Sequence, residues 1–261
     1  DAAPARGRAS TRRPGFLPGA TSGIGRALAG ARHEQGSTVV VGGRRADLLE
    51  RIAVEHPGLD TVRIDTTDPG SIAAAAKEVL DRHPDLDTLV TMAGIMRTED
   101  WHHPEGFLDT AEQIVTTNVL GPIRLVGAFV EHLQTRPRAT IVTVSSGLAF
   151  APLAATPTYD ASKAAIHMLS EALRLQLADT RVDVVELVPP SVATDLMPGQ
   201  RDSAIAMPLD EFVTEVVELL RTQPDAHEIL VERVKFLRFG EARGDYDDVV
   251  RTLNASDPHG R

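Results

Sequence analysis

The chain has 261 residues, a length typical of one α/β domain at roughly 100–200 residues per domain. Its 42% hydrophobic and 25% charged residues exclude wholesale disorder, and its net charge of -10 argues against nucleic acid or an anionic membrane surface as a partner. The absence of cysteine excludes disulfides, thiolate metal sites and cysteine nucleophiles, and it predicts a reducing compartment, the cytoplasm.

The first residues are rich in Arg, Ala and Pro without hydrophobic periodicity, which predicts a flexible tail over residues 1–14. From residue 15 onward, short β-branched runs alternate with longer amphipathic segments, so strands are expected to alternate with helices. The clearest predicted strands are Thr38–Val41, Thr61–Ile64, Thr88–Thr91, Thr140–Val144 and Val182–Val188. The predicted helices are Gly25–Gln35, Ala46–Glu55, Ser71–Arg82, Leu108–Leu133, Tyr159–Ala178 and Leu209–Thr222.

This alternation predicts one α/β domain over residues 15–261, built on a doubly wound parallel sheet with helices on both faces. The strands are nearly continuous apolar runs, as expected when both faces of a sheet are covered. Residues from about 225 to 261 read as a strand-like run, a basic-aromatic segment and an acidic helix, and are expected to extend the same domain. No apolar run approaches the roughly 20 residues of a membrane-spanning helix.

A glycine-rich loop stands at the start of the alternation, with the spacing G-x-x-x-G-x-G. Glycines in such a turn let the backbone approach a pyrophosphate, and the N-terminus of the next helix stabilises its charge. The loop therefore predicts a dinucleotide site, although a glycine-rich loop alone is weak support. Its candidate contacts are Gly19, Ser22, Gly23, Ile24 and Gly25. Pro18 comes just before the loop, and since proline cannot donate to a strand ladder, the first strand is expected to be cut short or distorted at its end.

The end of the second predicted strand carries Gly43, at the position where an acidic residue would bind a ribose 2′-hydroxyl. Arg44 and Arg45 follow, and their guanidinium groups can bind a 2′-phosphate. This arrangement predicts a preference for NADP(H) over NAD(H). The alternative is a solvated basic pair at the start of a helix.

A serine at a strand end and a Tyr/Lys pair form the most informative constellation. Ser145 and Ser146 end the fifth predicted strand, and Tyr159 and Lys163 lie one helical turn apart on the next helix. Residues at i and i+4 share a helix face, so the phenol and the ammonium can meet. Such a pair alone is more often two exposed side chains without a function. Its position after a serine and a glycine-rich loop makes a chance occurrence a poor explanation.

The serine, the Y-x-x-x-K pair and the glycine spacing together resemble the short-chain dehydrogenase/reductase superfamily over about residues 17–196, with Ser146 rather than Ser145 at the family's spacing. Within it the chain is most similar to a bacterial group named for the D-alanine lipoteichoic-acid operon. The segments VSSGLAFAPLAATPTYDASKAAIH, NVLGPIRL and EILVERVKFLRFGEARGDYD carry that similarity. The resemblance implies a Rossmann-type fold and hydride transfer between NADP(H) and a small-molecule carbonyl or secondary alcohol.

The resemblance also implies residue roles. Tyr159 would donate a proton in reduction and accept one in oxidation, and Ser146 would bind the substrate oxygen. Lys163 would bind the nicotinamide ribose, and Asn118 would position a proton-relay water. A nearby ammonium and the positive ring of the oxidised cofactor are expected to lower the pKa of Tyr159. Further implied cofactor contacts are Asp65 (otherwise a turn residue), Ala93, Gly94, Tyr159, Lys163, Pro189, Val192 and Thr194.

Three departures from the family pattern keep an alternative open: Pro18, the Thr91-Met92 pair and Pro190. They favour, as a second hypothesis, a cofactor-binding protein with weakened or no catalysis, acting as a sensor or scaffold. A serine hydrolase that uses Ser146 and Lys163 is a third, although no G-x-S-x-G elbow is present. No metal site is predicted, because the histidines lack H-E-x-x-H or similar spacing and His102-His103 reads as a loop pair.

Two further expectations concern surfaces. The loops 95–107 and 196–208 are expected to line the substrate pocket, but their composition does not identify the substrate. The helices at 108–133 and 159–178 are expected to pack against a second copy, as a homodimer or homotetramer, through small and apolar residues. Those residues are Ala161, Ala164, Ala165, Met168 and Ala172.

Overall fold

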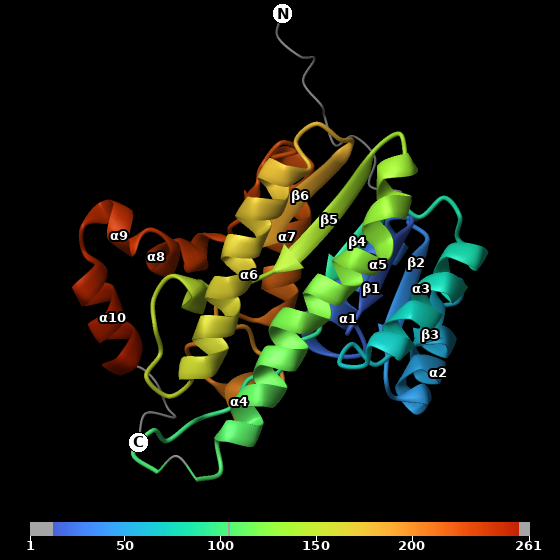
Figure 1. Cartoon of the computed structure of the whole chain (residues 1–261). Coiled ribbons are helices and arrows are strands. Elements are labelled where there is room, and N and C mark those ends of the chain that lie inside the picture. The colour runs from blue at the N-terminus through green and yellow to red at the C-terminus, as the bar shows by residue number, and fades with distance from the viewer. Residues whose placement is uncertain (1–12, 104, 256–261) are drawn as a thin grey trace, which may run out of the picture.

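A computed structural model describes residues 13–103 and 105–255. Seven parallel strands form one sheet in the order β3-β2-β1-β4-β5-β6-β7 (Figure 1). The strands are β1 (Gly15–Pro18), β2 (Val39–Gly43), β3 (Asp60–Arg63), β4 (Thr88–Thr91), β5 (Ala139–Val144), β6 (Val182–Leu187) and β7 (Glu228–Ile229). The predicted doubly wound sheet is confirmed. Its chain order reverses between β1 and β4, and ligands of such sheets bind in the crevice beyond the carboxyl ends of the strands at that point.

Helices cover both faces of the sheet. They are α1 (Gly23–Glu34), α2 (Ala46–Glu55), α3 (Pro69–Arg82), α4 (Leu108–Val115), α5 (Gly121–Thr135), α6 (Pro157–Gln176), α7 (Leu209–Thr222), α8 (Lys235–Arg238), α9 (Gly240–Arg243) and α10 (Tyr246–Ala255). One core cluster joins the sheet to α1, α2 and α7, through side chains such as Leu28 and Phe212. The other joins the opposite face to α3 and α5, through side chains such as Val79 and Phe129.

Strand β1 accommodates its proline by losing pairing on one side only. The backbone N–H groups of Gly15 and Gly19 donate toward β2, so the missing N–H of Pro18 falls on the side of β4. The ladder with β2 covers all four residues of β1, whereas the ladder with β4 ends at Phe16. The expected disturbance at the end of the strand is therefore a loss of ladder on the β4 side.

The predicted helix Leu108–Leu133 is not a single α-helix. A π-helical turn, Thr116–Leu120, separates α4 from α5 and contains the buried Asn118. Among the described residues, Leu108–Thr135 is the one helical stretch that is long and apolar enough, by length and composition alone, to cross a membrane. The buried side chains of its α5 part, such as Phe129, pack on the sheet.

The chain beyond α7 forms β7 at the sheet edge and then the short helices α8, α9 and α10 at one side of the molecule (Figure 1). This agrees with the strand-like run, basic segment and acidic helix expected there. At the other end of the chain, residues 1–12 of the predicted tail lie outside the described residues. Arg13 bonds to Asp87 at 2.7 Å and to the Arg138 carbonyl at 2.7 Å, so the side chain at this position is held against the sheet.

Candidate active site

A cleft of about 280 Å³ lies at the carboxyl ends of the central strands and contains most of the predicted site residues. It is lined by the glycine loop, the end of β4, the end of β5, the start of α6 and the loop after β6. The predicted residues that line it are Gly19, Ser22, Gly23, Ile24, Gly25, Gly94, Ser146, Tyr159, Lys163, Pro189, Val192 and Thr194. The structure thus brings the proposed cofactor loop and the proposed catalytic side chains to one cavity.

The glycine loop has the geometry that a phosphate site requires. Gly19 has φ +87°, and a Cβ there would lie 2.6 Å from the backbone of Ala93, so the loop and the end of β4 touch through backbone alone. Gly23 has φ +53° and begins α1, whose N-cap residue Ser22 makes no side-chain capping bond. The first N–H groups of α1 therefore keep their hydrogen-bonding capacity at the cleft, where an anion is stabilised. These features fit a dinucleotide pyrophosphate.

The second part of the expected cofactor site lies at the ends of β2 and β3. Burial acts to raise the pKa of Asp65, but hydrogen bonds from the Thr67 N–H and hydroxyl, and then the positive charge of Arg44, outweigh burial and lower it. Arg44 itself is exposed. Gly43 leaves no room for a side chain, because a Cβ there would lie 2.3 Å from Thr21 Cγ2. Arg44 and Asp65 thus lie close to each other, next to Gly43, which has no side chain, at the end of β2.

Tyr159 and Ser146 form the centre of the cleft. Tyr159 lies in the first turns of α6 and is only 5% exposed, and the Ser146 hydroxyl is close enough to the phenol to act against the rise of its pKa. Ser146 also caps a short 3₁₀ turn, where its Oγ accepts the Leu148 N–H at 3.1 Å. The cap holds the Ser146 hydroxyl in place at the cleft that Tyr159 also lines.

Lys163 and Asn118 stand on either side of Gly94. Lys163 Nζ lies 5.5 Å from the centre of the Tyr159 ring and donates to the Val144 carbonyl at 2.9 Å. Asn118 binds the backbone of Ile95 through both amide atoms at 2.9 Å, so it holds the loop after β4. A Cβ at Gly94 would lie 3.4 Å from Asn118 Oδ1 and 3.7 Å from Lys163 Nζ, which are ordinary van der Waals contacts, so both side chains lie next to this glycine.

The electrostatics of the pair differ from the sequence prediction. Burial raises the pKa of the Tyr159 phenol above its usual range, which outweighs the opposite effect of the Ser146 hydrogen bond. Burial also lowers the pKa of Lys163 to about 8. In the protein chain by itself the low polarity around the phenol therefore dominates and disfavours the phenolate. The expected lowering of the Tyr159 pKa depends also on the charge of a bound oxidised cofactor and stays a prediction.

A second pocket, of about 130 Å³, adjoins the cleft and shares Ser146, Tyr159 and four loop residues with it. Both loops expected to line a substrate pocket contribute, for example through Met96 and Met197. The C-terminal helices contribute Leu237 and Leu253, which the sequence did not predict. Nothing in their spacing marks them, since their position depends on how α8 and α10 fold back.

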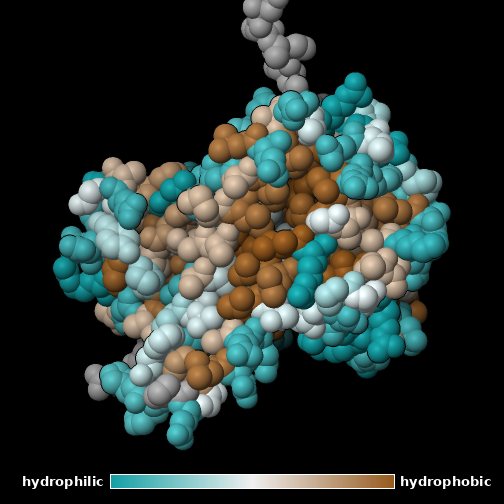
Figure 2. Space-filling view, viewed as in Figure 1, coloured by the Kyte–Doolittle hydropathy of each residue, from teal (hydrophilic) through white to brown (hydrophobic). Residues whose placement is uncertain are grey.

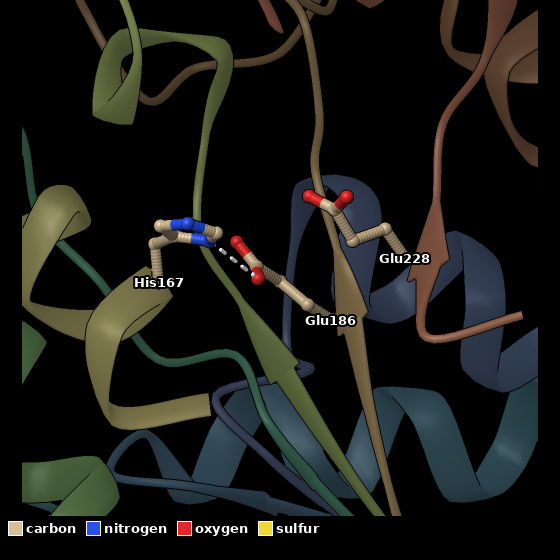
Figure 3. A group of neighbouring side chains, drawn as sticks. All are labelled: His167, Glu186 and Glu228. Atoms are coloured by element: carbon tan, nitrogen blue, oxygen red, sulfur yellow. Dashed lines mark hydrogen bonds and ion pairs between the residues drawn. The ribbon is translucent and has the colours of Figure 1, made fainter. Parts of the chain in front are cut away.

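Sequence reasoning also missed a polar cluster behind the serines, on α6, β6 and β7. His167, Glu186 and Glu228 place ligand-type atoms within 4.8 Å of one another (Figure 3). However, Glu186 binds His167 at 2.9 Å and accepts the Ser145 hydroxyl. Glu228 receives two hydrogen bonds from the Arg238 guanidinium, at 2.8 and 3.0 Å. The two carboxylates already have partners, and a metal ion would have to compete with the Arg238 cation.

The remaining predicted cofactor contacts lie outside the cleft lining. Arg45 is at the N-terminal end of α2 and lines an open groove beside α1, which adjoins the cleft at Ser22 and Gly23. Ala93 packs under Gly19, and Asn118 is behind the wall of the cleft. Pro190, Met92 and Arg97 line the cleft without having been assigned a role, and Met92 and Pro190 are two of the departures from the family pattern.

Known proteins resemble this chain over most of its length. The family model for short chain dehydrogenase matches residues 16–204. The uncharacterized oxidoreductase DltE of Bacillus subtilis (strain 168) is 36% identical over 248 residues, covering 93% of this chain and 96% of its own.

Among solved structures, a short chain dehydrogenase from Burkholderia cenocepacia J2315 in complex with NADP is 26% identical, with a TM-score of 0.79, covering 94% of this chain and 98% of its own. An alcohol dehydrogenase from the archaeon Thermococcus sibiricus, complexed with 5-hydroxy-NADP, is 25% identical, with a TM-score of 0.75, covering 84% of this chain and 96% of its own. The chain is therefore a member of the short-chain dehydrogenase family, and it is similar to the DltE oxidoreductase within that family.

Proposed function

We propose that the protein is an NADP(H)-dependent oxidoreductase that interconverts a small-molecule carbonyl and the corresponding secondary alcohol. The observation that carries this proposal is the convergence of Ser146, Tyr159 and Lys163 on the cleft that the glycine loop lines. A nicotinamide cofactor, when bound, supplies or accepts the hydride.

The protein side chains act on the substrate oxygen. Tyr159 donates its phenolic proton to that oxygen in reduction, and Ser146 hydrogen-bonds to it and holds it in place. The raised pKa of Tyr159 keeps the phenol protonated at neutral pH, as a proton donor must be. Because the pKa of Lys163 is about 8, its amine is mostly protonated at neutral pH, and the ammonium lies close to the Tyr159 ring. Lys163 is proposed to bind the nicotinamide ribose.

The proposed preference for NADP(H) rests on Gly43, Arg44 and Arg45. No carboxylate is present at Gly43 to repel a 2′-phosphate, and Arg44 is exposed at the strand end beside Asp65. The Burkholderia and Thermococcus structures hold NADP and 5-hydroxy-NADP, whereas a similar 3-ketoacyl-(acyl-carrier-protein) reductase structure from Brucella melitensis holds NADH. These neighbours support a nicotinamide cofactor, and the proposed preference rests on the residues at the end of β2. The other proposed cofactor contacts are Gly19, Ser22, Gly23, Ile24, Gly25, Asp65, Ala93, Gly94, Pro189, Val192 and Thr194.

A cofactor-binding protein without turnover remains the second candidate, and Met92 is the observation that favours it. A Cβ at Gly25 would lie 2.4 Å from Met92 Sδ, so the thioether lies directly against the glycine loop. Pro190 also lines the cleft, and it has no N–H to offer a carboxamide. The serine hydrolase is less well supported, because Lys163 Nζ donates to the Val144 carbonyl and no histidine lines the described cleft.

Oligomerisation and location are part of the proposal. Met168 and Leu175 of α6 are 65% and 79% exposed, and Ile123 of α5 is 44% exposed. Apolar side chains gather over these two helices on one face of the molecule (Figure 2). A second copy that packs on this face would give a homodimer or homotetramer. A cytoplasmic location is supported by the lack of cysteine.

The test is titration of the protein with NADPH, followed by turnover of a panel of ketones and aldehydes. Binding with turnover supports the oxidoreductase. Binding without turnover of any carbonyl supports the second candidate, and no binding of either NADPH or NADH contradicts both.

A further inference from the structure

The second pocket, which begins at the Ser146 and Tyr159 hydroxyls, is mainly apolar and uncharged. Its described lining contains no Asp, Glu, Lys, Arg or His. Its polar members are Ser146, Tyr159, three further Ser or Gln side chains and backbone groups, and Gln200 already donates to the Val192 carbonyl at 2.7 Å. The remaining side chains are Met96, Leu148, Leu153, Pro189, Pro190, Leu196, Met197, Ile205, Leu237 and Leu253.

Helix α10 is hydrogen-bonded to the loop before α6 and forms one wall of this pocket. Asn254 Oδ1 accepts the Ala154 N–H at 2.8 Å, and Asn254 Nδ2 donates to the Pro152 carbonyl at 3.0 Å. The neighbouring Leu253 packs against the buried cluster that contains Tyr159. The backbone of the loop before α6 therefore fixes the position of Leu253 relative to the phenol.

Helix α8 reaches the pocket through a close contact with the loop after β5. A Cβ at Gly147 would lie 2.6 Å from Leu237 Cδ1, so only glycine at this position lets Leu237 lie against the residue next to Ser146. The C-terminal helices α8 and α10 thus bring Leu237 and Leu253 into the pocket that Ser146 and Tyr159 also line.

We infer that the substrate is an uncharged ketone or secondary alcohol with a compact apolar body, and that Leu237 and Leu253 determine this specificity. The inference rests on the proposed oxidoreductase function and names its substrate class. An ionised group in this pocket would lose its hydration and find no opposite charge, which is strongly unfavourable. The pocket of about 130 Å³ is close to the apolar cavity of about 150 Å³ that holds one benzene molecule, so the body is the size of one ring.

In the reduction, the carbonyl carbon gains a hydride from the reduced nicotinamide and the oxygen gains a proton from Tyr159. The ketone is reduced by two electrons to the secondary alcohol, and the nicotinamide is oxidised by two. The apolar body takes no part in this exchange. It occupies the leucine pocket and holds the carbonyl beside the two hydroxyls.

Two ketones that differ by one carboxylate test the substrate class: acetophenone and 4-acetylbenzoate. We expect kcat/KM with saturating NADPH to be at least about a hundredfold higher for acetophenone. Leu237→Arg and Leu253→Arg place a cation in the pocket and should lower this ratio by at least about tenfold, mainly by improving 4-acetylbenzoate. Phe236→Arg, on the same helix but outside the pocket lining, is the matched control and should leave the ratio unchanged.

Binding gives a readout that is independent of turnover. Dissociation constants for both ketones are measured by ligand-observed NMR, with NADPH present, on the parent and on Tyr159→Phe, which retains the pocket. The same preference for acetophenone is expected in both proteins. Circular dichroism checks that each arginine variant is folded. If an arginine variant is unfolded, Leu237→Gln or Leu253→Gln replaces it in the experiment, and we expect the glutamine variant to lose acetophenone binding.

The outcomes separate the inference from the proposed function. Equal or better use of 4-acetylbenzoate by the parent overturns the apolar substrate class while leaving the oxidoreductase in place. Turnover of neither ketone, with selective binding of acetophenone, supports the pocket specificity and contradicts only the assumed reactivity. Absence of acetophenone binding, or an unchanged ratio in both arginine variants, overturns the inference.

Discussion

Asp160 Oδ2 accepts the backbone N–H of Leu153 at 2.7 Å, and this bond ties the first turn of α6 to the loop that forms one wall of the apolar pocket. Thr156 Oγ1 donates to the other oxygen at 3.1 Å. The Asp160 carboxyl group is buried beside Tyr159 and close to Glu99. Burial and the negative charge of Glu99 both raise the pKa of Asp160.

The first prediction is that Asp160 makes the protein less stable as the pH rises. Burial raises its pKa from 3.8 to about 7, so the folded chain holds the proton more tightly than the unfolded chain. Below about pH 4 Asp160 makes its full contribution to the free energy of unfolding. This contribution is lost as the pH rises through 7, and the loss between pH 5 and 8 is roughly 2 kcal/mol. Asp160→Asn should remove most of that loss, measured by urea unfolding at both pH values.

Its control is Glu218→Gln. Glu218 is on the surface, where a hydrogen bond from Arg221 lowers its pKa, so it stays ionised across this range. The control should keep the parent's difference in unfolding free energy. An Asp160→Asn variant with the same pH dependence as the parent would show that the carboxyl titrates in its ordinary range.

The second prediction concerns Tyr159→Phe. The change removes one hydroxyl and keeps the ring, so fold and cofactor binding should persist. Loss of a positioned proton donor is expected to lower kcat by about 100- to 10,000-fold. Tyr246→Phe is the matched control, because Tyr246 is the other of two tyrosines and lies at the start of α10. Near-normal turnover by Tyr159→Phe would remove the catalytic assignment.

The third prediction is a preference for NADPH that depends on Arg44. A hydrogen bond to a charged group contributes roughly 1.5–3 kcal/mol, so Arg44→Ala should reduce the ratio of the NADH to the NADPH dissociation constant by about ten- to a hundredfold. Added salt should weaken NADPH binding more than NADH binding, because Arg44 is exposed. Arg51→Ala, an exposed arginine further along α2, should leave the ratio unchanged. Equal affinities in the parent would mean that Arg44 and Arg45 are only a solvated pair.

The fourth prediction is that the exposed face of α6 forms the contact between copies. Leu175→Glu should shift the protein toward monomer in light scattering at micromolar concentration, because the glutamate loses its hydration in a packed interface. Val54→Glu is the control, since Val54 on α2 is 79% exposed, as is Leu175. A parent that is monomeric at this concentration, or a Leu175→Glu variant that stays assembled, would contradict the proposal.

Local patterns predicted the elements well where side-chain periodicity is strong. The amphipathic segments Ala46–Glu55 and Leu209–Thr222 match α2 and α7 residue for residue. The π-helical turn around Asn118 was not predicted, because the apolar pattern runs through it without interruption. Most residues of the cleft could be named in advance because the glycine spacing and the Tyr159/Lys163 pair resemble the family pattern, which implies the remaining positions at the strand ends.

Properties that depend on packing were not readable from the sequence. Burial raises the pKa of Tyr159 in the protein chain by itself, and the sequence did not show this because burial of the phenol depends on loops and helices far apart in the chain. For the same reason Leu237 and Leu253 were missed: they reach the pocket only because α8 and α10 fold back on the loop after β5.

The contact between Gly43 and Thr21 constrains how cofactor use can diverge in descendants of this chain. A carboxylate at position 43 would repel a 2′-phosphate, but the first atom of any side chain there meets the Thr21 methyl group at 2.3 Å. An acidic substitution alone therefore perturbs the glycine loop that it is meant to serve. The Thr21 side chain has to rotate, or a smaller residue has to replace it, before a side chain at position 43 fits. Positions 21 and 43 are therefore coupled, and a change of cofactor selectivity at position 43 also acts on the glycine loop.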